Sequence, residues 1–412
     1  MSEYSVFSLT SYTRMNHMKA YNRFTRSLAL FIPLVVLGAC SSDSVNTPEI
    51  DAELSLQEQL KVVVDDAVES GLPGVSLHVQ SGRENIDIVA GVANRDTAEP
   101  VTPSSLFHAA SIGKTFTATM ILRLIDVGFL QLEDPIGSLL DPSMSSMIHD
   151  SDRITVEMLL GHTSGLHDYF GNPEFAVNFL ESPGRIWSPL EILGFIDNTQ
   201  NNFEPGTEFS YSNTNTVLLG VIAERVTGLP IGMALREWVF QPAGLENTFG
   251  VFENLGQPEA VRGYIPVDFV EDIVAEFDLT NIDVPLDGSD LDSSVWLHSE
   301  GHGDASVHST SSDLNSFIRT LIDTEALVSG DLKTRMLTEI IPGAGHGLGL
   351  FISDNGLMFE HAGDGLGVSS WMSFSPSADL SFATVVNGSF GTYGDIYSDY
   401  LNQLISVLER HE

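Results

Sequence analysis

Apolar residues recur along this chain with two spacings, one typical of helices and one typical of strands. Apolar positions three or four residues apart predict the longer helices, over residues 54–70, 116–125, 214–226, 313–322 and 397–408. Short β-rich runs predict strands over residues 75–80, 86–92, 347–352, 357–361, 369–374 and 380–386, with a hairpin joining the first two. Strand-forming segments therefore lie at both ends of the sequence, with a long helical stretch between them.

The stretch between the two groups of strands shows mainly helical signals and long loops. Short helices are predicted over residues 155–160 and 190–197. Residues 251–300 are acidic and irregular, and a lid over a cleft is one role that they could serve. Together these signals predict an α/β fold of the α+β kind. One antiparallel sheet is built from both chain ends and flanked by helices, and a mostly α-helical lobe is inserted over about residues 130–300.

The first forty residues differ in kind from the rest. Four basic residues precede the apolar run over residues 28–37, which is too short for a comfortable membrane span, and small residues follow it. This order predicts a secretory signal peptide over residues 1–40. The residues before Met15 or Met18 add nothing to a signal, so either methionine could be the true start.

Cys40 is the single cysteine of the chain and ends the predicted signal. The sequence Leu-Gly-Ala-Cys at this point resembles the lipobox of bacterial lipoproteins, and the alternative is a plain signal peptide with a chance cysteine. The resemblance implies export to the cell envelope or periplasm, with membrane attachment only through lipidated Cys40. The two serines after the cysteine favour the outer membrane of a two-membrane bacterium. Residues 41–53 then predict a flexible tether and residues 54–412 a folded domain.

The formal net charge of the chain is -38, from 18 Lys and Arg against 56 Asp and Glu. An acidic shell of this size repels nucleic acid and anionic membrane surfaces, so neither is expected as a partner. A solvated surface suited to a salty habitat explains the charge without any dedicated acidic function. The charge says little about the fold, and the sequence leaves the oligomeric state open.

Residues 107–115, with the sequence FHAASIGKT, are the strongest chemical signal. They predict a loop that feeds the helix over residues 116–125, with Ser111 at the helix N-terminus and Lys114 one turn later on the same face. The helix dipole and the lysine can together activate a serine hydroxyl as a nucleophile. A Ser-x-x-Lys pair is common, and an N-cap serine beside a surface lysine is the structural alternative.

Five further motifs follow in a fixed order. They are LLGHTSGL at residues 159–166, PGTEFSYSN at 205–213, PAGLENT at 242–248, HSTSSDL at 308–314 and HAGDGLG at 361–367. With the Ser-x-x-Lys pair, this ordered set resembles the serine β-lactamase-like hydrolases, over about residues 56–408. By pattern the nearest members are class C β-lactamases, D-alanyl-D-alanine carboxypeptidases, D-aminopeptidases and related esterases.

The resemblance implies a role for each matching residue. Ser111 matches the acylated nucleophile, Lys114 its partner in proton transfer, and Tyr211 the tyrosine that shares this proton traffic. Asn213 matches the asparagine that holds the lysine side and the substrate amide. The tyrosine and the lysine would each need a pKa below the solution value near ~10 to act at neutral pH.

The strand motif supplies the rest of the site by resemblance. His361 takes the place where many relatives have lysine, and Gly363 matches the small residue that lets substrate lie against the strand edge. The oxyanion hole would use the backbone N–H groups of Ser111 and Asp364. A histidine is charged only part of the time near neutrality, so a fixed cation for a substrate carboxylate is not guaranteed. The Asp364 carboxylate either points away from the site or disfavours anionic substrates.

These features predict a serine hydrolase that forms an acyl-enzyme on Ser111 and cleaves an ester or amide such as a D-amino-acid peptide. The expected partner is a small-molecule or peptide substrate, and no cofactor or metal is required. A β-lactamase proper and a non-catalytic envelope binding protein that keeps the fold are the alternatives. His162 is expected to hold its turn, and the pair His298 and His302 lacks a third metal ligand.

Overall fold

The computed structural model describes residues 50–51, 53–197, 199–251, 258–277, 289–297, 302–305, 307–353 and 356–411. The predicted signal peptide, its Cys40, and almost all of the predicted tether lie outside the described residues. Among the residues described, no single helix is long and apolar enough to cross a membrane, and one sharply bent pair, Asn213–Thr227 with Ile231–Ala243, passes the same test of length and composition.

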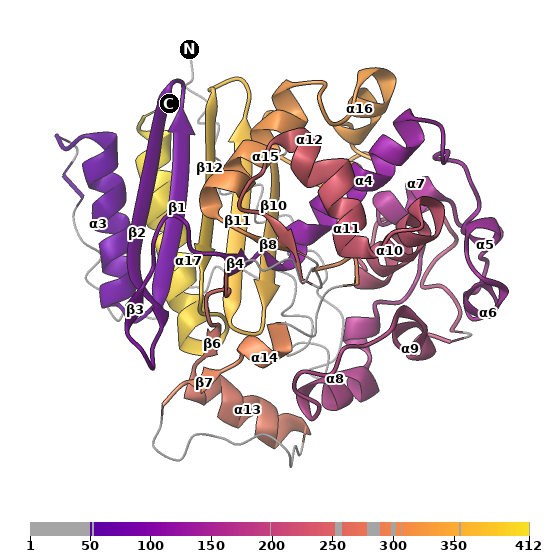
Figure 1. Ribbon diagram of the computed structural model, residues 1–412, viewed down its shortest axis with the longest axis horizontal. Helices are drawn as coiled ribbons and strands as arrows, with labels where there is room; N and C mark the ends of the chain where they lie inside the picture. Colours follow the sequence, from indigo (N-terminus) through magenta and orange to yellow (C-terminus); the bar gives the residue numbers. More distant parts are fainter. Residues whose placement is uncertain are drawn as a thin grey trace.

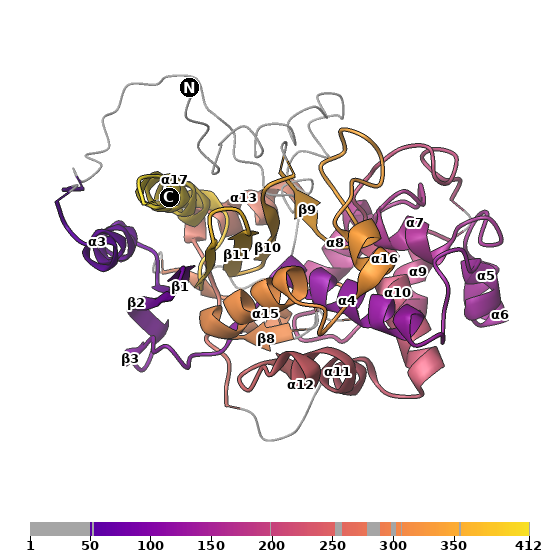
Figure 2. The same ribbon diagram turned by 90° about the horizontal axis from the view of Figure 1, so that it is seen from above.

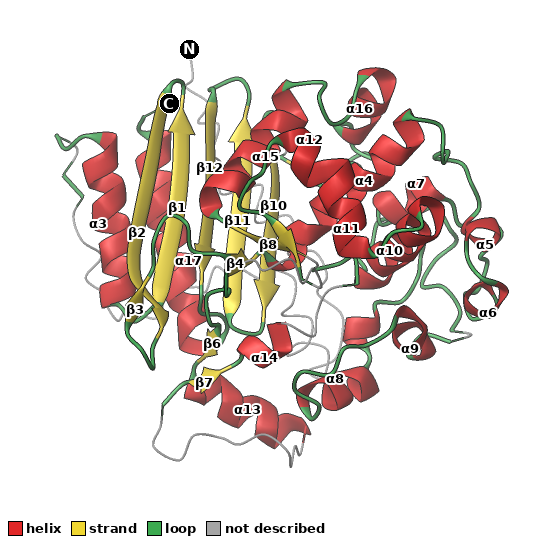
Figure 3. Cartoon of the chain, in the orientation of Figure 1, coloured by secondary structure: helices red, strands yellow, loops and turns green. Residues whose placement is uncertain are grey.

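The fold is centred on a seven-stranded sheet in which neighbouring strands run antiparallel, in the order β3-β2-β1-β12-β11-β10-β9 (Figures 1 and 3). The strands are β1 (Gly74–Ser81), β2 (Glu84–Asn94), β3 (Glu99–Pro100), β9 (Phe351–Ile352), β10 (Phe359–Gly365), β11 (Val368–Ser375) and β12 (Leu380–Val386). The two chain ends meet where β1 pairs with β12, with Val75 opposite Val386. The predicted sheet built from both termini is confirmed.

Helices cover both faces of the sheet (Figure 2). On one face lie α3 (Leu56–Glu69) and α17 (Gly391–Glu409), which pack against each other and on apolar side chains of β1 and β12. On the other face lie α15 (Ser311–Asp323) and, further along the sheet, α4 (Gly113–Asp126). The second face is therefore the one that joins the sheet to the helical lobe.

The inserted lobe is mostly helical, as predicted. Its helices are α5 (Ile136–Leu139), α6 (Pro142–Ser145), α7 (Val156–Leu160), the 3₁₀ turn η4 (Tyr169–Gly171), α8 (Pro173–Leu180), α9 (Pro189–Gly194), α10 (Asn213–Thr227), α11 (Ile231–Leu235), the π-helical turn η5 (Arg236–Phe240) and α12 (Gln241–Ala243). A small sheet of β4 (Phe107–His108), β8 (Val307–Ser309) and β5 (Phe249–Gly250) connects the lobe to the start of α4. The remaining short elements are β6 (Tyr264–Ile265), β7 (Leu291–Asp292), α14 (Ser294–Leu297) and α16 (Gly330–Met336).

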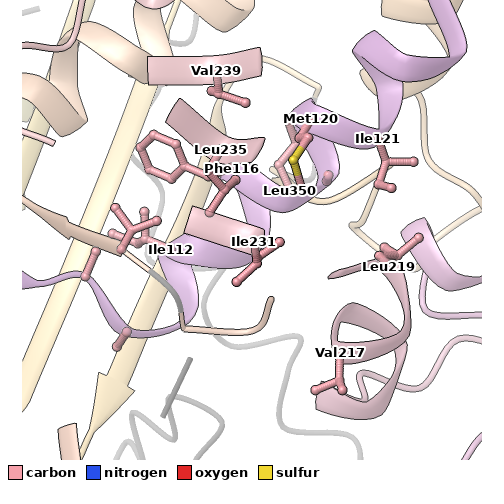
Figure 4. Close-up of a cluster of buried hydrophobic side chains, with 14 of the residues drawn as sticks. Ile112, Phe116, Met120, Ile121, Val217, Leu219, Ile231, Leu235, Val239 and Leu350 are labelled. Carbon is pink, nitrogen blue, oxygen red and sulfur yellow. The ribbon is translucent and has the colours of Figure 1, made fainter. Parts of the chain in front are cut away.

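Helix α4 is buried on nearly every side, which fixes the residues at its start. Its apolar side chains pack against α10, α11 and η5, and Figure 4 shows Phe116 beside Leu235 in this cluster. Its buried hydroxyls are also satisfied, because Thr115 donates to Gly349 O at 2.9 Å and Thr117 to Gly303 O at 2.7 Å. A helix packed in this way is a rigid support for chemistry at its N-terminal end.

Three local predictions differ from the structure. The stretch predicted as irregular contains the 11-residue amphipathic helix α13 (Val267–Phe277). Helix α17 starts six residues earlier than predicted and includes Gly391 and Gly394 in its first turn. Strand β9 keeps only Phe351 and Ile352 of the predicted run. Gly349 has φ 82° there and approaches α4 so closely that a Cβ would lie 2.1 Å from Ala118 Cβ.

Candidate active site

Ser111 lies in the single 3₁₀ turn η3 (Ala110–Ile112), which leads directly into α4. The residue before it, Ala110, has φ 47° in the left-handed region that non-glycine residues rarely adopt. The backbone N–H of Ala110 donates to His108 Nδ1 at 3.1 Å, which holds this conformation. Strain of this kind concentrates at functional sites and persists only when the surrounding structure imposes it.

Lys114 reaches back over one helical turn to Ser111, as the spacing predicts. Its side chain is only 2% exposed, and Nζ donates to Ser111 Oγ at 2.9 Å. Nζ also donates to the backbone oxygen of Asp304 at 3.0 Å. Two directed hydrogen bonds therefore place the lysine amine against the serine hydroxyl, and a surface lysine beside an N-cap serine is excluded.

Tyr211 lies beside Ser111 and Lys114, within reach of hydrogen bonds to both side chains. Lys114 Nζ lies 5.5 Å from the centre of the Tyr211 ring. Burial raises the pKa of the Tyr211 phenol above 10, although the Lys114 charge and both hydrogen bonds act in the opposite direction. The expected downward shift of this pKa is therefore wrong for Tyr211, and the phenol keeps its proton at neutral pH.

His162 supports the loop that carries Tyr211. Its Nδ1 accepts hydrogen bonds from the backbone N–H of Ser212 at 3.2 Å and from Asn215 Nδ2 at 3.0 Å. Its ring stacks on the Tyr211 ring, with 4.5 Å between centres and 25° between planes. Burial lowers the pKa of His162 well below its usual value, with His346, Lys114 and His361 adding to the effect. The neutral ring thus contacts the tyrosine and its loop.

Asn213, the first residue of α10, is held by Asp168, which the sequence analysis missed. Asn213 Nδ2 donates to both carboxylate oxygens, at 3.1 and 2.9 Å, and the backbone N–H of Phe170 donates to Oδ1 at 3.1 Å. Burial raises the pKa of Asp168 to about 6. The signal that could have found it is the Asp-Tyr-Phe-Gly turn after the second motif, because aspartate often caps such turns.

His361 is 1% exposed and neutral. Its Nδ1–H donates to the backbone oxygen of Ala362 at 2.6 Å, and Nε2 has no hydrogen-bond partner among the described residues. Burial, and then the nearby Lys114 charge, lower the pKa of His361 to about 3. The expectation of a partly charged histidine near neutrality is therefore wrong. The site has no fixed cation at this position.

Gly363 brings strand β10 against the nucleophile. A Cβ on Gly363 would lie 2.7 Å from the Ser111 nitrogen and 2.8 Å from both Ala109 O and Ser370 Oγ. Ser370 Oγ in turn donates to Ala109 O at 2.9 Å, which fastens β11 to the same turn. The small residue is thus required by the close approach of η3 itself, in addition to any space that a substrate needs.

Asp364 carries its carboxylate on the other face of β10. Neighbouring strand residues point to opposite faces, and Asp364 pairs with Ser369 while Gly363 pairs with Ser370, which faces η3. Ser369 Oγ donates to Asp364 Oδ1 at 2.6 Å, and burial raises the pKa of this carboxyl to about 6. Of the two expectations for Asp364, the structure favours a side chain turned away from the nucleophile.

A pocket opens beside these groups. It is lined by Ser111, Lys114, Phe170, Asn213, Asp304, Ala305 and Asp364. The structure therefore brings together Ser111, Lys114 and Asn213 from the helical side and Asp364 from the strand side, as predicted. Asp304 is a lining residue that no motif indicated.

His298 lies outside the described residues, and within the described ranges no three His, Cys, Asp or Glu side chains are grouped to hold a metal.

Comparisons with known proteins agree with this geometry. The sequence model of the family described as Beta-lactamase matches residues 58–405. The chain belongs to the β-lactamase family of serine hydrolases. Penicillin-binding protein 4 of Amycolatopsis lactamdurans is 26% identical over 366 residues, which are 82% of this chain and 87% of that protein. Esterase EstB of Burkholderia gladioli is 31% identical over 235 residues, 50% of this chain and 57% of the esterase.

A solved structure supports the same assignment. The D-amino acid amidase of Ochrobactrum anthropi SV3, in complex with L-phenylalanine amide, superposes with a TM-score of 0.70 at 26% identity. The superposition covers 86% of this chain and 99% of the amidase. The relatives of this serine hydrolase therefore include penicillin-binding proteins, esterases and amidases that share one fold.

Proposed function

We propose that this serine hydrolase cleaves an ester or amide through an acyl-enzyme on Ser111. The observation that carries the proposal is the 2.9 Å hydrogen bond between Lys114 Nζ and Ser111 Oγ at the start of a buried helix. The alternative of a non-catalytic binding protein is disfavoured because the lysine is hydrogen-bonded to the serine and the tyrosine lies beside both. A site that had lost its activity would not need to keep this arrangement.

The proposed chemistry uses the contacts among these three side chains. Lys114, as an amine, accepts the Ser111 proton while Oγ attacks the substrate carbonyl. Tyr211 is a neutral phenol, so it donates its proton to the leaving group and recovers one from Lys114. The backbone N–H groups of Ser111 and Asp364 stabilise the oxyanion. Water then attacks the acyl carbonyl, its proton passes back through the same groups, and Ser111 is released.

The proposed substrate is an ester or a D-amino-acid amide or peptide. D-stereospecific amidohydrolase and D-amino acid amidase structures among the relatives support this class. The neutral state of His361 argues against substrates that need a fixed cation for a carboxylate, as a carboxypeptidase or a β-lactamase proper would. A chromogenic cephalosporin tests the β-lactamase alternative, which predicts rapid turnover of that compound.

The direct test is intact-mass analysis and peptide mapping after exposure to a fluorophosphonate. We expect one adduct, on Ser111, and none in the Ser111→Ala variant. We also expect the variant to fold normally and to lose hydrolysis of esters and D-amino-acid amides. A folded wild-type protein that forms no adduct would move the assignment to the binding-protein alternative.

We further propose that the chain is exported and anchored through lipidated Cys40, in the outer membrane of a two-membrane bacterium. The lipobox-like sequence that ends in Cys40 supports this location. Detergent-phase partitioning of the mature protein tests it, since a protein with lipid chains on its cysteine enters the detergent phase. The Cys40→Ser variant is expected to stay in the aqueous phase, and equal partitioning of both proteins would reject the anchor.

A further inference from the structure

Asp304 is held rigidly at the edge of the pocket. Its backbone oxygen accepts from Lys114 Nζ at 3.0 Å, and its Oδ2 accepts from the Tyr169 hydroxyl at 2.6 Å. Tyr169 and Asp304 are each only 4% exposed, and Asp304 lines the pocket. Because Tyr169 occupies Oδ2, Oδ1 is the carboxylate oxygen that remains for a ligand.

Asn213 presents an acceptor to the same pocket. Its amide nitrogen is turned to the Asp168 carboxylate by two hydrogen bonds, at 3.1 and 2.9 Å. The carbonyl oxygen at the other end of the amide group is therefore the atom that remains for the pocket, which Asn213 lines. Asp304 and Asn213, which line the same pocket as Lys114, thus each offer an oxygen atom that can only accept hydrogen bonds.

The charges of the pocket favour the same kind of ligand. Among the described residues that line it, Lys114 is the single basic residue and Asp304 contributes a carboxyl group, whereas the Asp364 side chain is turned to the other face of β10. Asp168 lies directly behind Asn213, and His361 is neutral. A substrate carboxylate would meet like charges in this pocket, whereas an ammonium group would meet acceptors on two sides.

We infer that Asp304 is a specificity-determining residue that binds a protonated amine next to the scissile bond. Lys114 Nζ joins Ser111 Oγ and the Asp304 backbone oxygen by one hydrogen bond each, and Asp304 and Ser111 line the same pocket. The cation must therefore be within a few bonds of the carbonyl under attack. Resting on the proposed function, this inference names the substrate class as α-amino esters and amides with a free amino group.

The first experiment measures protection of Ser111 in the full-length protein. Fluorophosphonate labelling is followed by intact mass in the presence of alaninamide or N-acetylalaninamide, each as D and L enantiomers. We expect at least one free-amine enantiomer to slow labelling at concentrations where its acetylated partner does not. Turnover of alanine p-nitroanilide against N-acetylalanine p-nitroanilide gives the matching kcat/KM values.

Variants test whether the Asp304 carboxylate causes the preference for a free amine. In Asp304→Asn we expect the free-amine preference to fall by about 10- to 100-fold, the range for losing a hydrogen bond to a charged group. Labelling of each variant without ligand is measured as the reference for its own protection. Tyr169→Phe keeps the charge and loses only the hydroxyl at Oδ2, so a smaller loss is expected. Asp65→Asn removes one charge from the exposed face of α3 and controls for the net charge of -38.

The outcomes separate the two proposals. If Ser111 forms no adduct, the proposed function fails and the amine preference fails with it. If Ser111 is labelled but acetylated and free amines protect equally in both enantiomers, the role of Asp304 is rejected and the acyl-enzyme stands. A loss of the amine preference in Asp65→Asn equal to that in Asp304→Asn would assign the effect to net charge and would also reject the proposal.

Discussion

The two sides of the active-site pocket are held in place by different means. The helical side carries Ser111 on η3 and Lys114 on α4, which continues that turn, so their separation follows from local helical geometry. The other side is formed by β10 and by the segment around Asp304, which come from distant parts of the chain. In the proposed function, the first side carries the nucleophile and its base, and the second supplies an oxyanion donor and the Asp304 carboxylate that binds the substrate. Substitution of Lys114 should therefore lower kcat for every substrate, whereas substitution of Asp304 should change the preference among substrates.

The largest effect is expected on the helical side. Lys114→Met keeps the buried aliphatic volume but removes the group that accepts the Ser111 proton. We expect kcat to fall by about 10³-fold or more, at the upper end for loss of a general base. Single-turnover hydrolysis of an active ester measures it, and the exposed Lys61→Met on α3 is the control. Unchanged acylation in Lys114→Met would reject the lysine as the base.

The second largest effect is expected from Gly363→Ala, which disturbs the contact between β10 and the turn η3. The added Cβ would lie 2.7 Å from the Ser111 nitrogen, so β10 or η3 must move and the oxyanion donors must separate. We expect kcat to fall about 10²- to 10³-fold, the usual cost of losing one such donor. Gly394→Ala is a matched control, because no atom lies within 4 Å of its added Cβ. Equal activity of the two variants would show that the close approach is not required.

The contrast between the locally fixed helical side and the side built from distant segments also explains what could be predicted from the sequence. The pairing of chain ends, the helical lobe and the group of Ser111, Lys114, Tyr211 and Asn213 followed from short-range spacing and from motif order. No motif indicated the roles of Asp168 and Asp304, because they act through partners such as Asn213 and Tyr169 that only folding brings near.

Protonation states were the weakest part of the sequence-based prediction. Burial and neighbouring charge set the pKa of a side chain, and neither can be read from a motif. The Tyr211 pKa is therefore raised where a lower value was expected, and His361 is neutral where partial charge was expected. The helix α13 was missed for a related reason, because a high density of acidic residues obscured its apolar positions.

A smaller effect is expected from substitution of His162, which supports the loop that carries Tyr211. His162→Phe keeps a ring to stack on Tyr211 but removes the acceptor for Ser212 N–H and Asn215 Nδ2. Two buried donors lose their partner, at about 1–3 kcal/mol for such a group. We expect kcat to fall about 10-fold, with KM nearly unchanged and a lower Tm. His149→Phe, at a half-exposed position, is the control. Full activity with a normal Tm would mean that the stacked ring alone holds the loop.

The smallest effect on activity is expected on the back of β10. Glu360 precedes His361 and points to the opposite face, where Trp371 Nε1 donates to its Oε2 at 3.1 Å. Burial raises the pKa of this carboxyl from 4.5 to about 7. The folded state therefore favours the protonated form. The stability that this preference contributes is fully present below pH 4.5 and is lost as the pH rises through 7.

Glu360→Gln removes that dependence while keeping an oxygen for Trp371. We expect the variant to be more stable than the wild type at pH 8, by on the order of 2 kcal/mol, and to match it at pH 5. Urea denaturation at the two pH values measures the difference, and the exposed Glu84→Gln controls for the loss of one charge. Hydrolysis should be unaffected, because Glu360 lies behind the strand that forms the pocket wall. A pH-independent difference would show that Glu360 is ionised in both states, and a loss of turnover would mean that the two faces of β10 are coupled.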